Sequence, residues 1–209
     1  MATVSLPEEH RPSVPLFLSG RREDEAALSG TATHLFLQFC DLSRLSAETV
    51  EEEIARLVTR QFLLPEDAAR VRRDEIALFC RSALFSRLRA GTVRREVRFH
   101  ALLPAEKFAG EADRREALCG RELLVQGVID CLIEEEDGYV LIDYKTDRLT
   151  PTELADPRLA AKKLTERHAP QLSYYAAACR RMYGTPPREV LIYSLPLGDT
   201  VAVPLSEEE

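Results

Sequence analysis

Two acidic residues and a lysine lie inside otherwise apolar segments in the second half of the chain. Asp130 ends the run Gly127-Val128-Ile129-Asp130, and Asp143 and Lys145 lie in the run VLIDYK. A buried carboxylate is costly unless a hydrogen bond, a counter-charge or a metal compensates it. The three side chains are therefore candidates for chemistry. The alternative is a salt bridge between Lys145 and one of the aspartates, without chemistry.

The spacing of these residues limits the directions in which their side chains point. Asp143 and Lys145 are two positions apart, so on a strand they project from one face. Asp137-Gly138 predicts a hairpin turn between the two apolar runs. A two-residue loop there would place Asp130 opposite Lys145, whereas a four-residue loop over 135–138 would place it opposite Asp143. Either even loop gathers all three groups on one patch, and an odd loop would separate Asp130 from the others.

Two carboxylates and an amine on one patch suit a divalent metal. Neighbouring carboxylates repel each other unless a cation or a proton lies between them. Mg²⁺ is a hard ion held by one or two carboxylates together with water and phosphate oxygens. A lysine beside the ion can orient or deprotonate water, and the ion can polarise a phosphate. The patch is therefore suited to hydrolysis of a phosphodiester.

The elements that must position this patch change in type half-way along the chain. The first half predicts helices, the first of them capped by Ser29-Gly30-Thr31. The second half predicts strands, and the first of these alternates Val93, Val97, Phe99 and Ala101 with polar residues. The expected helices span 29–39, 46–58, 65–90, 153–168 and 169–184, and the expected strands span 93–102, 121–133, 139–145, 189–195 and 200–205. This order predicts an α/β fold, a sheet flanked by helices with a helical N-terminal half.

Composition bounds the class of protein. The 209 residues are 45% hydrophobic and 30% charged, with a net charge of −7, which indicates one domain, alone or with a helical extension, and argues against bulk coating of DNA by positive charge. Residues 1–27 are polar, contain three prolines and predict a lead-in without a secretion signal. No apolar run is long enough to predict a membrane span.

The five cysteines and the arginines give weaker signals. The cysteine count is odd and no C-x-x-C pair occurs, which argues against a zinc ribbon, an Fe–S cluster or a disulfide scaffold and favours reduced thiols in a cytoplasmic protein. Positive charge gathers just before and within the first strand, at Arg87, Arg89, Arg94, Arg95 and Arg98. These side chains either line a path for nucleic-acid phosphates or form a solvated face balanced by the acidic residues.

Taken together, the motifs resemble the RecB-like branch of the PD-(D/E)XK nuclease superfamily, and in particular the nuclease domain of AddA-type helicase–nuclease subunits. The resemblance covers the chain from about Leu28 to its end. It rests on Gly127-Val128-Ile129-Asp130 and Ile142-Asp143-Tyr144-Lys145-Thr146-Asp147, with Gly30-Thr31-Ala32-Thr33-His34 before them and Gln171 and Tyr175 after them. It implies a single nuclease domain over 28–209 with a restriction-endonuclease-like mixed sheet.

The resemblance also implies roles for individual residues. The metal ligands would be the side chains of His34, Asp130 and Asp143 and the carbonyl of Tyr144, and the catalytic residues would be Asp130, Asp143, Lys145, Gln171 and Tyr175. Taken alone, His34 is typical of a core histidine, and imidazole suits Mn²⁺ better than Mg²⁺. Gln171 and Tyr175 share one helix face, as any amphipathic pair would. Glu96, in an E-x-x-F sequence, would have a supporting role near the site, or else an ion pair with Arg94 or Arg98.

The function implied is that of a Mg²⁺- or Mn²⁺-dependent deoxyribonuclease without an Fe–S cluster. It would act as an exonuclease on single-stranded DNA, in repair of double-strand breaks by recombination. The partners implied are DNA, a helicase domain in the same full-length protein and an AddB-like subunit, with no membrane. No G-x-x-x-x-G-K-[ST] phosphate loop occurs in the sequence, so an AddA-like chain would be an excised domain or a separate nuclease and not the motor. The alternatives are an inactive nuclease fold that binds DNA or a partner, and a stand-alone RecB-like exonuclease.

Overall fold

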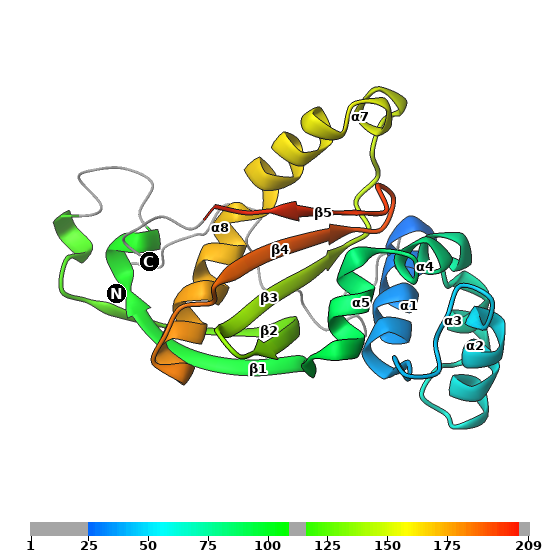
Figure 1. Cartoon of the computed structure of the whole chain (residues 1–209). Helices are drawn as coiled ribbons and strands as arrows, with labels where there is room; N and C mark the ends of the chain where they lie inside the picture. The colour runs from blue at the N-terminus through cyan, green and yellow to red at the C-terminus, as the bar shows by residue number, and fades with distance from the viewer. Residues whose placement is uncertain (1–24, 109–115, 205–209) are drawn as a thin grey trace.

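The computed structural model describes residues 25–108 and 116–204, and a mixed five-stranded sheet forms its centre (Figure 1). The strand order is β1-β2-β3-β4-β5. β3 and β4 are parallel, and the other neighbouring pairs are antiparallel. The strands are β1 (Thr92–Pro104), β2 (Glu122–Glu135), β3 (Gly138–Lys145), β4 (Glu189–Ser194) and β5 (Asp199–Ala202). The predicted α/β fold with a mixed sheet flanked by helices is confirmed.

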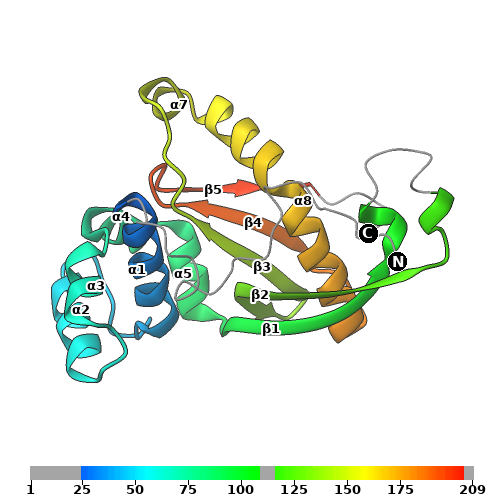
Figure 2. The same cartoon turned by 180° about the vertical axis from the view of Figure 1, so that it is seen from behind.

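The helices before β1 and the long helix between β3 and β4 pack on opposite faces of the sheet (Figures 1 and 2). The helices before β1 are α1 (Glu25–Phe39), α2 (Val50–Thr59), α3 (Pro65–Arg70), α4 (Arg73–Phe79) and α5 (Ala83–Ala90). The others are the 3₁₀ helix η3 (Ala105–Phe108) after β1, and α7 (Pro151–Ala155) and α8 (Pro157–Tyr183) between β3 and β4. The helical N-terminal half expected from the sequence is therefore present.

Three helix boundaries differ from the sequence prediction, each for a local reason. The expected helix over 65–90 is three helices, because Val71 is extended and Ser82 starts a new helix by accepting the N–H of Phe85. Ser29 is not a cap but lies inside α1, where its hydroxyl donates to the Arg70 carbonyl. The polar lead-in predicted for 1–27 lies outside the described residues up to 24, and 25–27 form the first turn of α1.

The helices predicted over 153–168 and 169–184 are also divided differently. A short α7 is followed by one long α8 that continues through Pro170 instead of breaking there. Proline removes one helical hydrogen bond. Residues on both sides of Pro170, including Leu164 and Leu172, are buried against the sheet. We attribute the continuity of α8 to this packing, which outweighs the lost bond.

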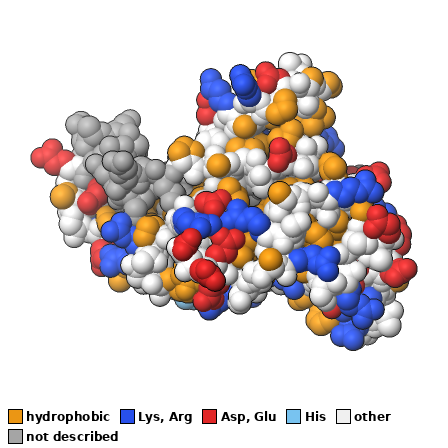
Figure 3. All heavy atoms as spheres, viewed as in Figure 1, with side chains coloured by type: hydrophobic (Ala, Val, Ile, Leu, Met, Phe, Trp, Pro, Cys, Tyr) orange, Lys and Arg blue, Asp and Glu red, His pale blue; other side chains and the backbone are white. Residues whose placement is uncertain are grey.

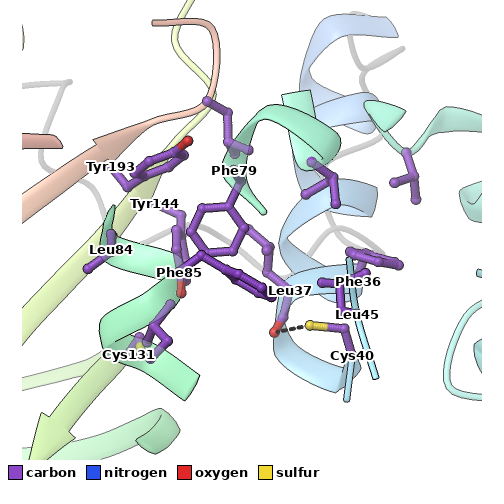
Figure 4. Close-up of a cluster of buried hydrophobic side chains, with 14 of the residues drawn as sticks. Phe36, Leu37, Cys40, Leu45, Phe79, Leu84, Phe85, Cys131, Tyr144 and Tyr193 are labelled. Carbon is purple, nitrogen blue, oxygen red and sulfur yellow. Dashed lines mark hydrogen bonds between the residues drawn. The ribbon is translucent and has the colours of Figure 1, made fainter. Parts of the chain in front are cut away.

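The sheet separates two apolar cores. The first joins α1–α5 to one face, and Phe79 lies at its centre with its ring edge-on to Tyr144 at 5.8 Å and to Tyr193 at 4.8 Å (Figure 4). The second joins α8 to the opposite face through residues such as Phe99 and Leu172. β3 contributes to both cores, since Tyr144 faces the first and Leu141 the second. The central strand is therefore held from both sides.

The cysteines serve mostly as small core residues. All five are free thiols, and Cys40, Cys131 and Cys179 are buried. Cys119 is exposed. Within 25–108 and 116–204, no helix combines the length and apolar character needed to cross a bilayer.

Candidate active site

The candidate site lies where β2 and β3 separate. The β2–β3 ladder runs from Glu135↔Gly138 to Cys131↔Ile142 and stops there. Beyond this point, Asp143, Tyr144 and Lys145 pair only with β4 on their other side. The N–H of Tyr144 instead donates to Asp130 Oδ2 at 2.9 Å. Asp130 therefore occupies the fork between the two strands and replaces a ladder bond there.

The hairpin register decides between the two even loops. The turn consists of residues 136 and 137, and Gly138 already belongs to β3 with φ 130°. Neither alternative, the two-residue loop at Asp137-Gly138 or the four-residue loop over 135–138, has the bounds of the observed turn. Continuing the observed register by one step places Asp130 opposite Asp143, as the four-residue alternative expected.

Asp143 and Lys145 project from the same face of β3, as expected from their spacing. Lys145 Nζ lies 2.5 Å from Asp143 Oδ2, and the Asp143 side chain is only 4% exposed. Asp143 Oδ2 nevertheless accepts no hydrogen bond within the described part of the chain. A buried carboxylate oxygen with charge contact but no directed hydrogen bond has lone pairs available for a further ligand.

The direction of Asp130 depends on an irregularity in β1 that the sequence did not predict. The β1–β2 ladder includes every pair from Thr92↔Glu134 to Pro104↔Glu122 except the one that would join Glu96 to Asp130. Glu96 has φ 52°, a conformation costly for a residue other than glycine. Val93 consequently packs in the first core, whereas Val97 packs in the second.

The predicted single face for Val93, Val97, Phe99 and Ala101 is therefore wrong. Irregular backbone at Glu96 and Asp130 lets the side chains of β1 and β2 that faced one core before this point face the other core after it.

The environment of Glu96 supports a place near the site. Burial raises the pKa of Glu96, and its charge in turn contributes to raising the pKa of Asp130. Arg94, one of the two expected ion-pair partners of Glu96, instead pairs with Glu134 at 3.0 Å.

His34 approaches the fork from α1. Its Nδ1 lies 3.7 Å from Asp130 Oδ2, and its ring meets the Tyr144 ring edge-on at 6.4 Å. Burial lowers the pKa of His34. One turn earlier in α1, a Cβ on Gly30 would lie 2.7 Å from Thr146 Oγ1. The glycine of the G-T-x-x-H motif therefore lets α1 come close to the end of β3.

Gln171 and Tyr175 reach the site from α8. Lys145 Nζ donates to Gln171 Oε1 at 3.1 Å, and Gln171 Nε2 donates to Tyr175 Oη at 3.0 Å. Both residues thus lie in one hydrogen-bonded chain that ends at Lys145, and Lys145 in turn forms an ion pair with Asp143. Every residue that the sequence singled out for the site lies in or beside this fork.

The electrostatics of the fork favour a bound cation. Burial, and then the charge of Asp143, raise the pKa of Asp130 to about 7. Burial, followed by the same charge, raises the pKa of Tyr175 to about 12. Two carboxylates therefore share a poorly solvated space in which Lys145 contacts Asp143 and, among the described residues, the backbone N–H of Tyr144 donates to Asp130.

The residues fit a Mg²⁺-type ion held partly by water. Within the described residues, no three His, Cys, Asp or Glu side chains form a group that could hold a metal by themselves. Mg²⁺ does not need such a group, because one or two carboxylates with water and phosphate oxygens are enough. Asp143, whose Oδ2 contacts Lys145, and the neighbouring Asp130 supply the two carboxylates.

Four of the five arginines before and within the first strand, all except Arg98, make a hydrogen bond or an ion pair within the described residues. Arg87 pairs with Glu135 and Glu189, and Arg95 donates to the carbonyls that end α1. In Figure 3, blue and red side chains alternate over the displayed face instead of forming a continuous basic surface. This outcome favours the alternative of arginines balanced by acidic residues.

Two further groups near the site were missed because their partners are remote in sequence. Arg72 donates to the carbonyl of Thr146 at 3.1 Å and so fixes the backbone just after Lys145. Asp147 accepts from Arg167 at 2.6 Å and lies 3.1 Å from His168 Nε2, which ties the same segment to α8. The motif letters Thr146-Asp147 were the only signal for this second group.

Comparison with known proteins decides the family. The model of the PD-(D/E)XK nuclease superfamily matches residues 14–204. The chain belongs to this superfamily.

The chain is also similar to the A-type subunits of bacterial ATP-dependent helicase/nucleases. The protein from Moorella thermoacetica is 39% identical over 185 residues, which cover 87% of this chain and 12% of that protein. The protein from Clostridium botulinum strain Langeland is 34% identical over 181 residues, which cover 86% of this chain and 13% of that protein. The chain is thus a nuclease domain related to AddA proteins and spans about one eighth of their length, which confirms the resemblance found in the sequence.

Proposed function

We propose that this chain hydrolyses phosphodiester bonds of single-stranded DNA with the help of Mg²⁺ or Mn²⁺. The observation that carries the proposal is the meeting of Asp130, Asp143 and Lys145 at the fork of β2 and β3. Membership of a nuclease superfamily makes hydrolysis, rather than a simple salt bridge, the function that this geometry supports best.

Each residue of the site would have a distinct role in the hydrolysis. Asp130 and Asp143 present oxygens to the ion, and His34 and the Tyr144 carbonyl complete the set of ligands. When bound, the ion polarises the scissile phosphate and stabilises charge on the leaving oxygen. Lys145 would orient the attacking water in line with phosphorus, and family chemistry implies that the 3′ oxygen leaves, which gives a 5′-phosphate and a 3′-hydroxyl. The water would stay near Lys145 because Asp143 and Gln171 hold the Lys145 amine from two sides.

An open cleft of about 450 Å³ beside the site offers a route for the DNA strand. It lies between the start of α1 and the segment after β3, and its lining includes Ser29, Arg72 and Arg148. Arg148 follows Lys145 by three residues, is exposed, and makes no hydrogen bond or ion pair with the described residues. The cleft's two glutamates, Glu25 and Glu75, already pair with arginines. Arg148 is therefore the group that we assign to a DNA phosphate.

The similarity to AddA proteins supports a place in a larger protein. The chain covers 12–13% of those relatives, whose name includes a helicase. We assign 28–209 to a single nuclease domain joined to a helicase in the full-length protein, with an AddB-like partner. In that setting it would act as an exonuclease in recombinational repair of double-strand breaks in the cytoplasm.

Cleavage of end-labelled single-stranded DNA tests the proposal. Wild-type protein should cleave with Mg²⁺ and stop when EDTA is added. Asp143→Ala and Lys145→Ala should each lose at least about 100-fold in rate, the scale found when one group that stabilises a transition state is removed. Lys162→Ala is the matched control, since Lys162 is a 72% exposed lysine on α8. Retained cleavage in Lys145→Ala would refute the role given to Lys145.

Calorimetry separates the nuclease from an inactive DNA- or partner-binding module. The nuclease should bind Mg²⁺ or Mn²⁺, and Asp130→Asn should abolish most of that binding while the folded state persists. A protein that binds DNA but shows no divalent binding dependent on Asp130 would instead be an inactive module.

A further inference from the structure

The glycine of the motif that ends in Asp130 faces an aromatic ring at very short range. Gly127 pairs with Phe99 across β1 and β2. A Cβ on Gly127 would lie 2.6 Å from Phe99 Cζ, 2.7 Å from Phe99 Cε1 and 3.2 Å from Tyr175 Cε1. Two of these three distances are far inside van der Waals contact. The rings of Phe99 and Tyr175 therefore occupy the space that any side chain at Gly127 would need.

The two rings support each other. Phe99 is 2% exposed, and its ring meets that of Tyr175 edge-on, with centroids 5.4 Å apart. Such aromatic pairs have a preferred geometry and are worth about 0.5–1.5 kcal/mol beyond the burial of area. Phe99 thus braces the Tyr175 ring from the side of the sheet.

Tyr175 is connected to Lys145 by directed bonds. Its hydroxyl accepts from Gln171 Nε2 at 3.0 Å, and Gln171 Oε1 accepts from Lys145 Nζ at 3.1 Å. The amide of Gln171 can serve both neighbours only in one orientation, because its nitrogen donates and its oxygen accepts. Because Lys145 can only donate, the amide keeps Oε1 toward Nζ, and the Tyr175 hydroxyl holds the other end of the amide by accepting from Nε2.

We propose that Gly127 and Phe99 are positioning residues, in which the bare backbone of Gly127 lets Phe99 brace Tyr175, and Tyr175 holds Lys145 through Gln171. The inference rests on the proposed nuclease function and deepens it. Gly127 and Phe99 are positioning residues and not catalytic residues, because neither touches the reacting groups. The glycine three positions before Asp130 is thereby explained by its contact with Phe99, and not by a turn or a positive φ.

The expected effect follows from the distances. Relieving a contact of 2.6 Å requires the Phe99 ring to move by about 1 Å, since carbon atoms pack at about 3.5–4.0 Å. A misplacement of about 1 Å at groups that position the reaction can cost about 100-fold in rate. Gly127→Ala should therefore lower kcat by about 10–100-fold and leave KM for DNA within about threefold.

The experiment compares Gly127→Ala and Phe99→Leu with Leu103→Ala. Leu103 is a matched control, because it is 1% exposed in the same strand and core but lies four residues beyond Phe99 along β1. Leu103→Ala should lose stability and keep the wild-type kcat. In a Gln171→Ala background, Gly127→Ala should cost little further activity, because the connection to Lys145 is already broken. Wild-type kcat in folded Gly127→Ala and Phe99→Leu, or full additivity with Gln171→Ala, would overturn the proposal.

A second readout does not depend on catalysis. The rate at which acetic anhydride labels Lys145, read by mass spectrometry against the exposed Lys162 as an internal reference, reports how firmly Lys145 is held. Labelling of Lys145 should rise in Gly127→Ala and Phe99→Leu, and stay at the wild-type rate in Leu103→Ala. Unchanged labelling in both test variants would also overturn the inference. If wild-type protein failed to cleave DNA but the labelling pattern held, the proposed function would fail and the positioning would stand.

Discussion

The metal-free protein should lose stability as the pH rises from about 4 to about 7, because Asp130 must then ionise in a buried site. Burial and the charge of Asp143 raise the pKa of Asp130 from the ordinary 3.8 to about 7. Between these values the unfolded chain has released the proton and the folded protein retains it, so each increase in pH favours the unfolded chain. The stability that the Asp130 proton contributes is complete below pH 3.8 and is lost above about pH 7.

The size of this effect can be estimated from the raised pKa. A difference between 3.8 and about 7 corresponds to at most about 4 kcal/mol, at about 1.4 kcal/mol for each pH unit. The Asp130 side chain retains 19% exposure and shares its environment with Asp143, so we expect about 2 kcal/mol in the free energy of unfolding. Divalent metal should remove the loss, since a bound cation favours the ionised carboxylate.

Urea unfolding in EDTA across this pH range measures the effect. Asp130→Asn should flatten the dependence of stability on pH, and it keeps an oxygen that can accept the N–H of Tyr144. Asp137→Asn is the matched control and should behave as wild type, because that side chain is 80% exposed. Equal pH slopes in wild type and Asp130→Asn, or no response of the wild type to Mg²⁺, would refute the reasoning.

Three further predictions follow from contacts at and around the site. Gly30→Ala should lower metal affinity and cleavage together, because its Cβ would lie 2.7 Å from Thr146 Oγ1 and push α1 with His34 away from the fork; unchanged metal affinity by calorimetry would contradict this. Arg148→Ala should raise KM for single-stranded DNA several-fold and reduce the salt dependence of binding by about one phosphate contact, with kcat retained; an unchanged salt slope would remove Arg148 from the DNA path. Glu53→Ala should cost about 3–5 kcal/mol of unfolding free energy, because it leaves the partly buried Arg56 and a backbone N–H without their partner; thermal unfolding checks this, and a loss below about 1 kcal/mol would show that the pair is worth no more than a surface ion pair.

Much of the site could be predicted because short-range rules decide it. The spacing of Asp143 and Lys145 requires a common face, and an even hairpin register places Asp130 opposite Asp143, although the direction of the Asp130 side chain depends on the irregularity at Glu96. The polar residues in apolar strands were informative because burial without compensation is costly. Gln171 and Tyr175 are four residues apart and could be predicted to lie on one face of a helix, where they form a hydrogen bond.

Other features escaped prediction because remote contacts determine them. The left-handed conformation of Glu96 has no local signal, and it moves Val93 and Val97 into different cores. Packing on both sides carries α8 through Pro170, against the usual effect of proline. The guanidinium of Arg95 binds carbonyls of α1 that are 55 or more residues away in sequence. In each case the partner is absent from the local sequence window.

The most direct test of the central claim is a crystal structure with Mn²⁺ and its anomalous signal. We predict one peak in the fork of β2 and β3, within about 2.0–2.4 Å of a carboxylate oxygen from Asp130 and from Asp143, with the Tyr144 carbonyl in the same shell. A fork without an anomalous peak at saturating Mn²⁺, with Lys145 still against Asp143, would contradict the account.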